Sequence, residues 1–432
     1  MKLNPQYKSM LETTFGNELS HQIEEAYNLE AVHGYRMNSL KMIEPFELDI
    51  PSPLNNDVYL PNQYNRLVTH PFHHAGGYYI QDPSASMPVV ALDLKPTDCV
   101  LDLCAAPGGK STYILTKISE GFLVANEVDS KRNQKLCHNF DRWGHENVVV
   151  VQNSTEQIAK ALPNTFDKVL LDAPCSGEGL FRRNPEFALE YQPQNALGFA
   201  KLQKELLEDA YHCVKDGGTL VYSTCTLNLH ENEGVIKHFL ESHPECSLMP
   251  LNLPESREGY EGFGNSVTRY FPSADAEGHF IAAIKIRKNE LDKELTFKPF
   301  KETTFDFFDR KIKGHFITKG DFVYGLKNRG SFNASLNIKR DGVLMGVVKK
   351  KHFDYDHALS QSASFKNDFE SIDLSLEDAY RYLYGHPINT TIRGIHCVTY
   401  KELSLGFVKG DGKRGNNRYP KGLRNRFEDY SY

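Results

Sequence analysis

The sequence predicts an α/β fold built on a doubly wound parallel sheet. Short, almost wholly apolar runs alternate with polar and amphipathic stretches from Asp98 to Lys288, which is typical of strand–helix–strand units. Strands that are apolar throughout belong in a sheet that helices cover on both faces. The clearest helix is expected at about residues 199–214. The expected strands are residues 99–105, 122–128, 147–152, 167–172, 218–224 and 279–286.

The first expected strand ends in a glycine turn that opens a helix. The apolar run gives way to Ala-Ala-Pro-Gly-Gly-Lys at residues 105–110, and a helix is expected from Ser111. Glycines let a ligand approach the backbone, and the amides at a helix N-terminus face negative groups. The turn is therefore a candidate site for a nucleotide-like cofactor. Its candidate contacts are Cys104, Ala105, Ala106, Pro107, Gly108, Gly109 and Lys110.

Three kinds of cofactor are considered for this turn: a nucleoside triphosphate, NAD and S-adenosylmethionine. Gly109-Lys-Ser111 matches the end of a phosphate-binding P-loop, but the glycine required five residues before Gly109 is Cys104 here. A P-loop NTPase stays a minor alternative, with Leu170-Leu-Asp172 as its second motif. The dinucleotide pattern G-x-G-x-x-G is missing, which argues against NAD. Glu127 ends the second expected strand and favours S-adenosylmethionine, because a carboxylate there can accept hydrogen bonds from both ribose hydroxyls.

Two further strand ends carry cysteines. The fourth expected strand ends in Asp172-Ala-Pro-Cys175 and the fifth in Tyr222-Ser-Thr-Cys225. The carboxyl ends of parallel strands meet at one edge of the sheet, so both cysteines are expected beside the glycine turn. A thiolate there can add to carbon 6 of cytosine and make carbon 5 nucleophilic enough to accept a methyl group. Asp172 is expected to hydrogen-bond the ring during this attack, and the second cysteine to assist the later release.

Length and composition describe an ordinary globular chain. Its 432 residues predict about two to four domains. No apolar run approaches the length of a membrane span, and the beginning of the chain lacks the layout of a signal peptide. The eight cysteines are scattered, without a C-x-x-C pair. These features predict a cytoplasmic protein with no metal site and no membrane partner.

The charge of the chain is unevenly distributed. The formal net charge is -6, yet residues 310–351 contain eleven Lys or Arg and two acids. Residues 409–432 contain seven Lys or Arg and three acids. Local basic regions on an acidic chain predict directed binding of a polyanion, although a solvated loop explains either region alone about as well.

The segment before the sheet is expected to be helical and then to form a connector. Residues 8–44 are expected to be helical, because four apolar residues recur at four-residue spacing: Phe15, Leu19, Ile23 and Tyr27. Four prolines mark residues 45–61 as a connector. The motif His70-Pro-Phe-His-His74 has no acid or cysteine at ligand spacing. Its histidines are therefore expected to be structural or to contact substrate rather than to bind a metal ion.

Three motifs follow one another along the chain: Cys104-Ala-Ala-Pro-Gly-Gly-Lys110, Asp172-Ala-Pro-Cys175 and Ser223-Thr-Cys225. In this order and spacing they resemble the Sun-domain family of RNA cytosine-5 methyltransferases. The tail at residues 419–424 is similar to the end of the PUA-like domain in the RsmF-like (YebU-like) branch, which acts on 16S ribosomal RNA. The resemblance implies a Rossmann-like class I S-adenosylmethionine-dependent methyltransferase sheet, an N-terminal helical segment and a C-terminal α+β PUA-like RNA-binding region. The expected domains are residues 1–90, 91–290, 291–365 and 366–432.

The resemblance also implies roles for single residues. It makes Cys225 the nucleophile and Cys175 the cysteine that helps to release the methylated RNA. DNA cytosine methyltransferases use the cysteine of a Pro-Cys pair, which here is Cys175, so the residues alone leave this assignment open. The implied cofactor contacts are residues 104–110, Glu127 and Asp172, and Lys110 is also expected to touch the target base.

The chain departs from the family pattern after the third expected strand. The family often carries an acid there, near the adenine, whereas this chain has Gln152-Asn-Ser154. Ser154 or Asn153 is expected to replace the acid with a neutral hydrogen bond.

The implied partner is RNA, expected to be 16S ribosomal RNA or the small ribosomal subunit. Transfer RNA is the alternative within the same family, and an RNA-binding protein that keeps a methyltransferase shell without catalysis is a further one. A paired target base would have to be unstacked and turned into the pocket, and basic side chains would hold the phosphates around it. The expected RNA contacts are Arg182, Arg183, Lys421 and Arg424.

Overall fold

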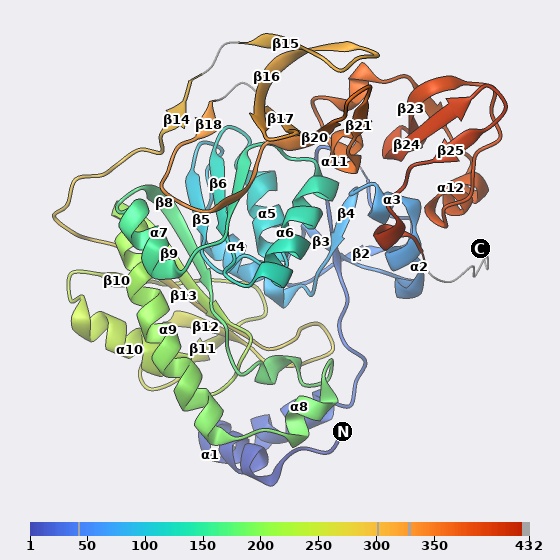
Figure 1. The fold of residues 1–432 in the computed structure, drawn as a ribbon. Coiled ribbons are helices and arrows are strands. Elements are labelled where there is room, and N and C mark those ends of the chain that lie inside the picture. Colours follow the sequence, from blue (N-terminus) through green and yellow to red (C-terminus); the bar gives the residue numbers. More distant parts are fainter. Residues whose placement is uncertain (42–43, 300–301, 327–329, 426–432) are drawn as a thin grey trace.

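A ten-stranded sheet forms the centre of the protein (Figure 1). The computed structural model describes residues 1–41, 44–299, 302–326 and 330–425. Five neighbouring strands of the sheet are parallel, in the order β7-β6-β5-β8-β9. They are β5 (Cys99–Asp102), β6 (Phe122–Asn126), β7 (Val148–Val151), β8 (Phe166–Asp172) and β9 (Val214–Thr224). The strands expected from the apolar runs are thus present, and the Rossmann-like α/β fold is confirmed.

The sixth expected strand, β13 (His279–Lys285), lies beside β9 but runs antiparallel to it. It follows β12 (Gly264–Tyr270) in an antiparallel hairpin, and a short hairpin connection forces the two strands to run in opposite directions. Two short strands, β10 (Ser247–Met249) and β11 (Arg257–Gly259), extend this side of the sheet. As a result, the first residue of β13 lies at the edge where the parallel strands end.

Helices cover both faces of the sheet, as the apolar strands predict. Successive strand residues alternate between two cores, as Val100 and Leu101 do in β5. One face packs against α4 (Met87–Ala91), α5 (Gly109–Lys117) and α6 (Ser130–Trp143). The other packs against α7 (Thr155–Ala161), α9 (Pro193–Cys213) and α10 (Glu233–Ser242), and α9 corresponds to the helix expected at residues 199–214. No helix among the described residues is both long and apolar enough to cross a membrane.

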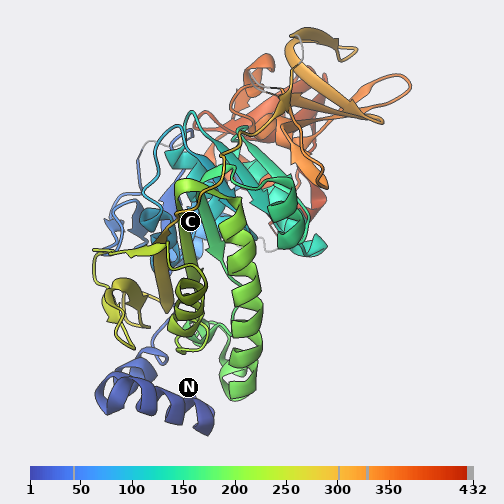
Figure 2. The ribbon, with the colours of Figure 1, turned by 90° about the vertical axis from the view of Figure 1, so that its left-hand side faces the viewer.

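The N-terminal segment differs from the expected long helix. α1 (Pro5–Ala26) ends just before Tyr27, the last residue of the four-residue apolar spacing, and α8 (Pro185–Leu189) lies near it (Figures 1 and 2). The helix expected up to residue 44 is wrong beyond this point, and residues 42–43 lie outside the described residues. The chain instead forms a four-stranded sheet, which also uses the supposed connector at residues 45–61. Its strands, in spatial order, are β2 (Ile50–Pro51), β3 (Val58–Leu60), β1 (Tyr35–Met37) and β4 (Tyr78–Ile80).

Aromatic packing explains this small sheet better than any periodicity does. The ring of Tyr35 lies 5.8 Å from that of Tyr59 and 5.1 Å from that of Tyr78, measured between centroids. Gly34 precedes β1 at a close approach, because a Cβ there would lie 2.6 Å from Cγ1 of Val58. The helices α2 (Tyr64–Thr69) and α3 (Pro71–His74) connect β3 to β4. Such short strands are stabilised by tertiary contacts, which a sequence pattern does not reveal.

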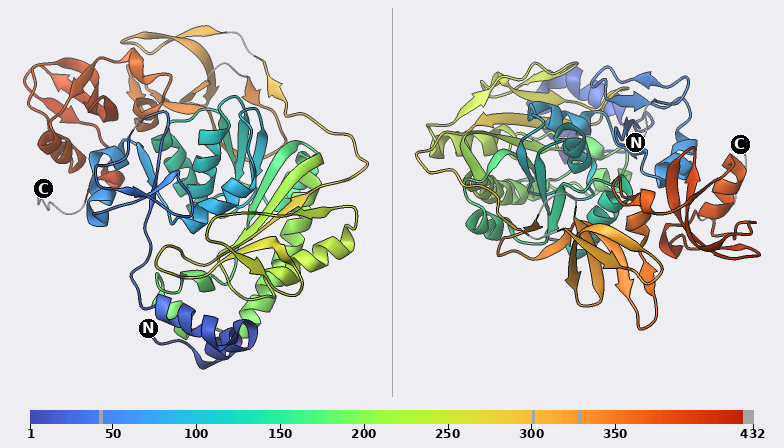
Figure 3. Two further views of the ribbon diagram at one scale, coloured as in Figure 1. Left: turned by 180° about the vertical axis from the view of Figure 1, so that it is seen from behind. Right: turned by 90° about the horizontal axis from the view of Figure 1, so that it is seen from above.

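The C-terminal part contains two further sheets, which lie side by side in the view from above in Figure 3. The first contains β15 (Thr303–Asp306), β16 (Lys311–Lys319), β17 (Phe322–Leu326), β20 (Val343–Val348) and β21 (Phe353–Tyr355). The second contains β22 (Ser371–Asp373), β23 (Arg393–Tyr400), β24 (Leu403–Asp411) and β25 (Gly415–Asn417), with α12 (Leu376–Leu383) packed against it. α11 (His357–Gln361) connects the two sheets, and β14 (Phe297–Lys298) pairs with β18 (Ser331–Phe332) ahead of the first.

One strand of the C-terminal part joins the central sheet. β19 (Ile338–Asp341) pairs antiparallel with β7 and covers the edge that β7 would otherwise expose. The side chain of Arg340, in β19, is 5% exposed and lies 2.8 Å from the carboxylate of Asp141 in α6. The described residues of the basic segment at 310–351 are therefore mainly in strands, and part of this segment is buried against β7 and α6.

Candidate active site

The two cysteines expected at neighbouring strand ends lie together. Their sulfur atoms are 3.3 Å apart and form a hydrogen bond. Cys225 follows β9 and Cys175 follows β8, and both side chains are half-buried. Cys225 lines a cavity of about 290 Å³, whereas Cys175 is not among the residues that line it. A substrate in this cavity therefore meets the sulfur of Cys225 first.

A charged pair lies in the same cavity. Lys110 Nζ donates a hydrogen bond to Asp172 Oδ2 over 2.7 Å, and Ser223 Oγ donates to Asp172 Oδ1 over 2.8 Å. Burial alone would raise the pKa of Asp172, but Lys110 and His279 hold it well below its usual range. Burial likewise opposes the charge on Lys110, yet the Asp172 carboxylate raises the pKa of the ammonium above its ordinary value. Both groups are therefore charged at neutral pH.

The glycine turn forms another wall of the cavity. Its residues from Cys104 to Pro107, together with Gly109 and Lys110, line the cavity alongside Cys225 and Asp172. Gly108 caps α5 with a φ of +110°, in the left-handed region that favours glycine. A Cβ on Gly109 would lie 3.2 Å from the side chains of Tyr79 and Gln81. The turn thus packs closely against neighbouring side chains, and the approach of a ligand to its backbone stays a prediction.

Glu127 follows β6 beside this turn. The N–H of Ala105 donates to the carbonyl of the preceding residue, Asn126, over 2.8 Å, which places Glu127 next to the turn. Its side chain is 3% exposed, and Oε1 accepts a hydrogen bond from the N–H of Asp129. Oε2 is buried with no hydrogen-bond partner among the described residues and lies 3.4 Å from Nη1 of Arg132. A hydroxyl donor of a ligand would satisfy this oxygen.

Ser154 has a local structural role. Its hydroxyl accepts a hydrogen bond from the N–H of Gln157 and caps α7. The side-chain oxygen of Asn153 accepts from the N–H of Asn337 over 3.0 Å. The structure does not bring Ser154 into the cavity, and its contact with an adenine stays a prediction.

The expectation that Arg182 contacts RNA is wrong. Its side chain is 1% exposed and pairs with the fully buried carboxylate of Glu277 at 2.5 Å. The same carboxylate lies 2.9 Å from Arg183, which is less buried and lines the cavity. Glu277 lies far along the sequence from both arginines, so the motif at residues 172–185 gave no sign of it. Arg182 therefore stabilises the fold around the cavity, and Arg183 alone of the two is placed to reach a substrate.

His279, to which no motif in the sequence pointed, also lines the cavity. It is 3% exposed, and neither ring nitrogen has a hydrogen-bond partner among the described residues. Nε2 lies 3.9 Å from Oδ1 of Asp172, and burial lowers the pKa of the imidazole below its ordinary value. A polar residue at the head of an apolar strand was the available signal. It becomes meaningful only once β13 is known to run antiparallel.

Two histidines of the motif make structural contacts, and contact of the motif with substrate stays a prediction. His70 caps α3, accepting a hydrogen bond from the N–H of Phe72. His74 bonds with the Tyr419 hydroxyl at 2.7 Å and with Oδ1 of Asn425 at 2.9 Å. These contacts attach the tail to the N-terminal segment. No group of three or more His, Cys, Asp or Glu within the described residues is arranged to hold a metal ion.

The two expected RNA contacts in the tail differ in their exposure to solvent. Lys421 is exposed at the start of a short 3-10 turn, whereas Arg424 is half-buried. The guanidinium of Arg424 donates to the Tyr419 carbonyl and lies against Gly385, where a Cβ would be 2.4 Å from it. Of the two, Lys421 is the more accessible to a phosphate.

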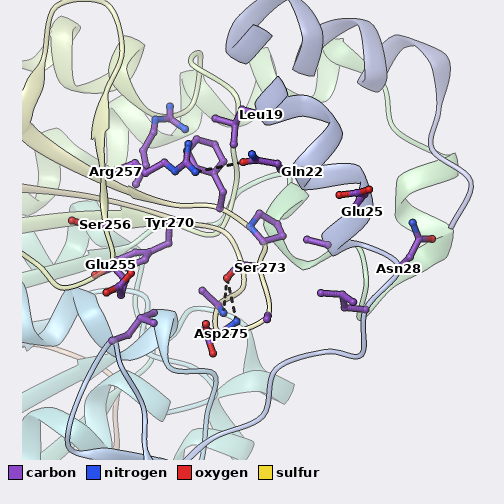
Figure 4. A pocket seen from close by; sticks show the side chains of 18 residues that line it. Leu19, Gln22, Glu25, Asn28, Glu255, Ser256, Arg257, Tyr270, Ser273 and Asp275 are labelled. Carbon is purple, nitrogen blue, oxygen red and sulfur yellow. Dashed lines mark hydrogen bonds between the residues drawn. The ribbon is translucent and has the colours of Figure 1, made fainter. Parts of the chain in front are cut away.

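A larger cavity, of about 840 Å³, lies between α1 and the residues around β12 (Figure 4). It shares no lining residue with the cysteine cavity. Its polar groups bond with one another: Arg257 donates to Gln22, and the N–H of Asp275 donates to the Ser273 hydroxyl. It holds none of the residues expected to be functional.

Comparison with known proteins agrees with this geometry. The family model described as 16S rRNA methyltransferase RsmB/F matches residues 89–285, and the RsmF PUA domain matches residues 369–425. Ribosomal RNA small subunit methyltransferase F of Aliivibrio fischeri (strain MJ11) is 32% identical over 81% of this chain and 80% of its own. The same enzyme of Salmonella arizonae is 33% identical over 81% and 79%.

A solved structure gives the same result. A methyltransferase homologue from Pyrococcus horikoshii is 29% identical, with a TM-score of 0.56 over 66% of this chain and 99% of its own. These findings confirm the resemblance stated from the three motifs, including the PUA-like region, and remove the P-loop NTPase alternative. The chain therefore belongs to the RsmB/F family of 16S rRNA methyltransferases.

Proposed function

We propose that this protein transfers a methyl group from S-adenosylmethionine to carbon 5 of a cytosine in 16S ribosomal RNA. Membership of the RsmB/F family supports ribosomal RNA as the substrate and S-adenosylmethionine as the cofactor. The single observation that carries the cytosine-5 chemistry is the pair of thiols 3.3 Å apart, one of which lines the cavity that the glycine turn also lines.

The residues around the turn fit the cofactor. Most residues of the turn line the cavity, and the unsatisfied Oε2 of Glu127 suits a ribose hydroxyl. When bound, S-adenosylmethionine supplies an electrophilic methyl group. Residues 104–110 would hold it against the cavity wall, with Lys110 and Asp172 at the boundary with the base.

Asp172 and Lys110 are suited to recognising cytosine. An ionised carboxylate only accepts hydrogen bonds, and cytosine presents the amino group N4 as a donor where uracil presents an oxygen. The ammonium of Lys110 can donate to the ring acceptors and stabilise the negative charge that develops when a thiolate adds to carbon 6. We infer that Asp172 favours cytosine over uracil and that Lys110 lowers the barrier to addition.

The two thiols have different roles in the reaction. Cys225 would lose its proton to solvent and add as a thiolate to carbon 6, and carbon 5 could then take the methyl group as the bond between that group and the sulfonium sulfur breaks. The hydrogen bond with Cys225, together with burial, raises the pKa of the Cys175 thiol. Once the sulfur of Cys225 is bonded to the base, this hydrogen bond is weakened, so Cys175 can release its own proton to solvent, and the resulting thiolate can take the proton from carbon 5. Loss of that proton expels the Cys225 thiolate and restores the aromatic ring.

Methyl transfer from labelled S-adenosylmethionine to 16S RNA, taken from cells that lack this gene, tests the assignment. Cys225→Ala is expected to abolish transfer, and Cys175→Ala to accumulate a covalent protein–RNA adduct that survives denaturing electrophoresis. Cys137→Ala, in α6 and outside the cavity, serves as the control and is expected to retain activity. Full activity of Cys225→Ala would refute the mechanism, and an adduct formed by that variant would exchange the roles of the two cysteines.

The position of the target requires a separate measurement. Bisulfite sequencing of cellular RNA with and without the gene is expected to show one or more 5-methylcytosines in 16S RNA that depend on it. A lost mark confined to transfer RNA would assign the protein to the transfer RNA alternative. RNA binding without any lost mark would indicate the non-catalytic alternative.

A further inference from the structure

A cavity of about 410 Å³ lies where the catalytic part, the N-terminal segment and the C-terminal tail meet. α6 contributes His138, Asn139 and Arg142 to its lining, α11 contributes His357, and the tail contributes Tyr419. The hydrogen bond between His74 and Tyr419 holds the tail against this opening. The cavity therefore exists only while the C-terminal part is docked on the rest of the molecule.

This cavity adjoins the one that contains Cys225. Tyr79 and Ile80, at the end of β4, line both cavities. Asn139, which lines the second cavity, donates a hydrogen bond over 2.8 Å to the carbonyl of Pro107, which lines the first. A single layer of residues thus separates the two spaces.

Flat rings and one cation dominate the lining of the second cavity. The rings of His357 and Tyr419 lie edge to face, with their centroids 5.3 Å apart. Burial lowers the pKa of His357 to about 3 and that of His138 below its ordinary value, so both imidazoles are neutral at pH 7. Arg142 is the residue with a permanent charge among those described in the lining, and its guanidinium lies 5.9 Å from the centre of the Tyr79 ring.

We propose that this cavity is a second nucleotide site, which holds the RNA nucleotide next to the target cytosine while the target occupies the Cys225 cavity. The inference rests on the proposed function. Turning a base out of a helix leaves its neighbour unstacked on one side, and aromatic or imidazole rings can stack on the exposed face. Arg142 has N–H groups beyond the two bonds that it makes to His73 and Asn139, and these can reach the linking phosphate.

The occupant is a nucleotide rather than a free anion because of what surrounds Arg142. A phosphate site is usually built from several cations or backbone amides, whereas here one guanidinium is set among rings. That combination matches a base and a single phosphate. The site would also make the PUA-like tail part of target selection, because Tyr419 forms one of its walls.

Paired changes in protein and RNA test this site. The RNA is a synthetic 16S fragment that contains the mapped cytosine, made intact and with the base removed from each neighbouring position in turn. The protein variant is His138→Ala, because His138 lines the cavity and is only half-buried. Lys135→Ala, on an exposed position of the same helix and outside the cavity, is the matched control.

Removing the base on one side of the target is expected to weaken binding to the wild-type protein by about tenfold. His138→Ala is expected to bind the intact RNA about tenfold more weakly and to show no further loss with the abasic RNA, whereas Lys135→Ala behaves as the wild type does. Equal losses for wild type and His138→Ala at every neighbouring position would overturn the proposal. Methylation of the intact RNA by the wild type is measured in parallel, so its absence would count against the proposed function rather than against this site.

Discussion

Asp102 and Asp172 end neighbouring strands of the sheet, yet their surroundings shift the pKa of the two carboxyl groups in opposite directions. Asp172 pairs with Lys110 and stays ionised. Asp102 is 1% exposed, accepts one hydrogen bond from Ser111 over 2.5 Å and has a second oxygen with no partner among the described residues. Burial raises the pKa of Asp102 to about 7. Asp102, the last residue of β5, is therefore close to half protonated at neutral pH.

This shift predicts a pH-dependent stability. The unfolded chain releases the Asp102 proton near pH 4, whereas the folded chain keeps it up to about pH 7, so the wild type loses stability as the pH rises through that window. Asp102→Asn cannot ionise and is expected to gain stability relative to the wild type between pH 5 and 8, by about 2–4 kcal/mol. Chemical unfolding at both pH values measures the difference.

Asp172→Asn provides the control for this experiment. The folded-state pKa of Asp172 is lowered, so the stability it contributes is present above pH 4 and lost only below it. Its difference from the wild type is expected to stay constant from pH 5 to 8. A constant difference for Asp102→Asn as well would contradict the raised pKa.

At the scale of elements, the site depends on where strands end and helices begin. β5, β8 and β9 deliver the glycine turn, Asp172 and Cys225 to one edge, and the antiparallel β13 brings His279 to the same edge. α5 begins at this edge, and its first turn is fixed by the left-handed backbone of Gly108. A change in the start of this helix therefore moves the wall of the cofactor cavity.

Gly108→Ala is expected to disturb both the fold and cofactor binding. The left-handed backbone costs a non-glycine residue about 1–3 kcal/mol, and the new Cβ would lie 3.1 Å from Leu136. The affinity for S-adenosylmethionine, measured by calorimetry, should fall about tenfold or more because the turn shifts. Gly16→Ala in α1 has a φ of +78° and open space around the new Cβ. It should lose stability and keep its affinity, and an equal loss of affinity in both variants would point to general unfolding.

The sequence predicted the elements whose signal is local. The five parallel strands are apolar throughout, so the sequence pattern predicts them. The two glycines after β5 likewise predict the turn that follows this strand. The strands of the small sheet are two or three residues long, too short to show a period. The direction of β13 and the burial of Arg182 against Glu277 depend on partners distant in the chain. Such contacts leave no trace in a single sequence.

At the scale of the whole molecule, the C-terminal part is anchored to the catalytic part at several points. β19 extends the central sheet, and Ser362 donates a hydrogen bond over 2.6 Å to the buried carboxylate of Glu146. Gln361 accepts a hydrogen bond from Lys41 of the N-terminal segment. These contacts fix residues 338–362, which precede the PUA-like region, on the central sheet and the N-terminal segment.

The pair formed by Arg340 and Asp141 tests this anchoring. Arg340→Ala leaves the partly buried carboxylate of Asp141 without its cation and is expected to destabilise the protein by about 3 kcal/mol. The neighbouring Lys339 is exposed, so Lys339→Ala removes a charge from the same strand and should change the free energy of unfolding by less than about 0.5 kcal/mol. Urea unfolding of both variants measures the contrast. Equal stabilities would mean that this ion pair adds little to the anchoring of β19.

The position of β19 has a consequence for biosynthesis. A ribosome completes the five parallel strands long before it reaches Ile338–Asp341, and until then the four valines of β7 lie on an open border of the sheet. An open border of this kind pairs readily with strands of other molecules. A nascent chain therefore exposes this border until Asp341 has left the ribosome. Truncated chains that end before β19 are therefore expected to aggregate through β7.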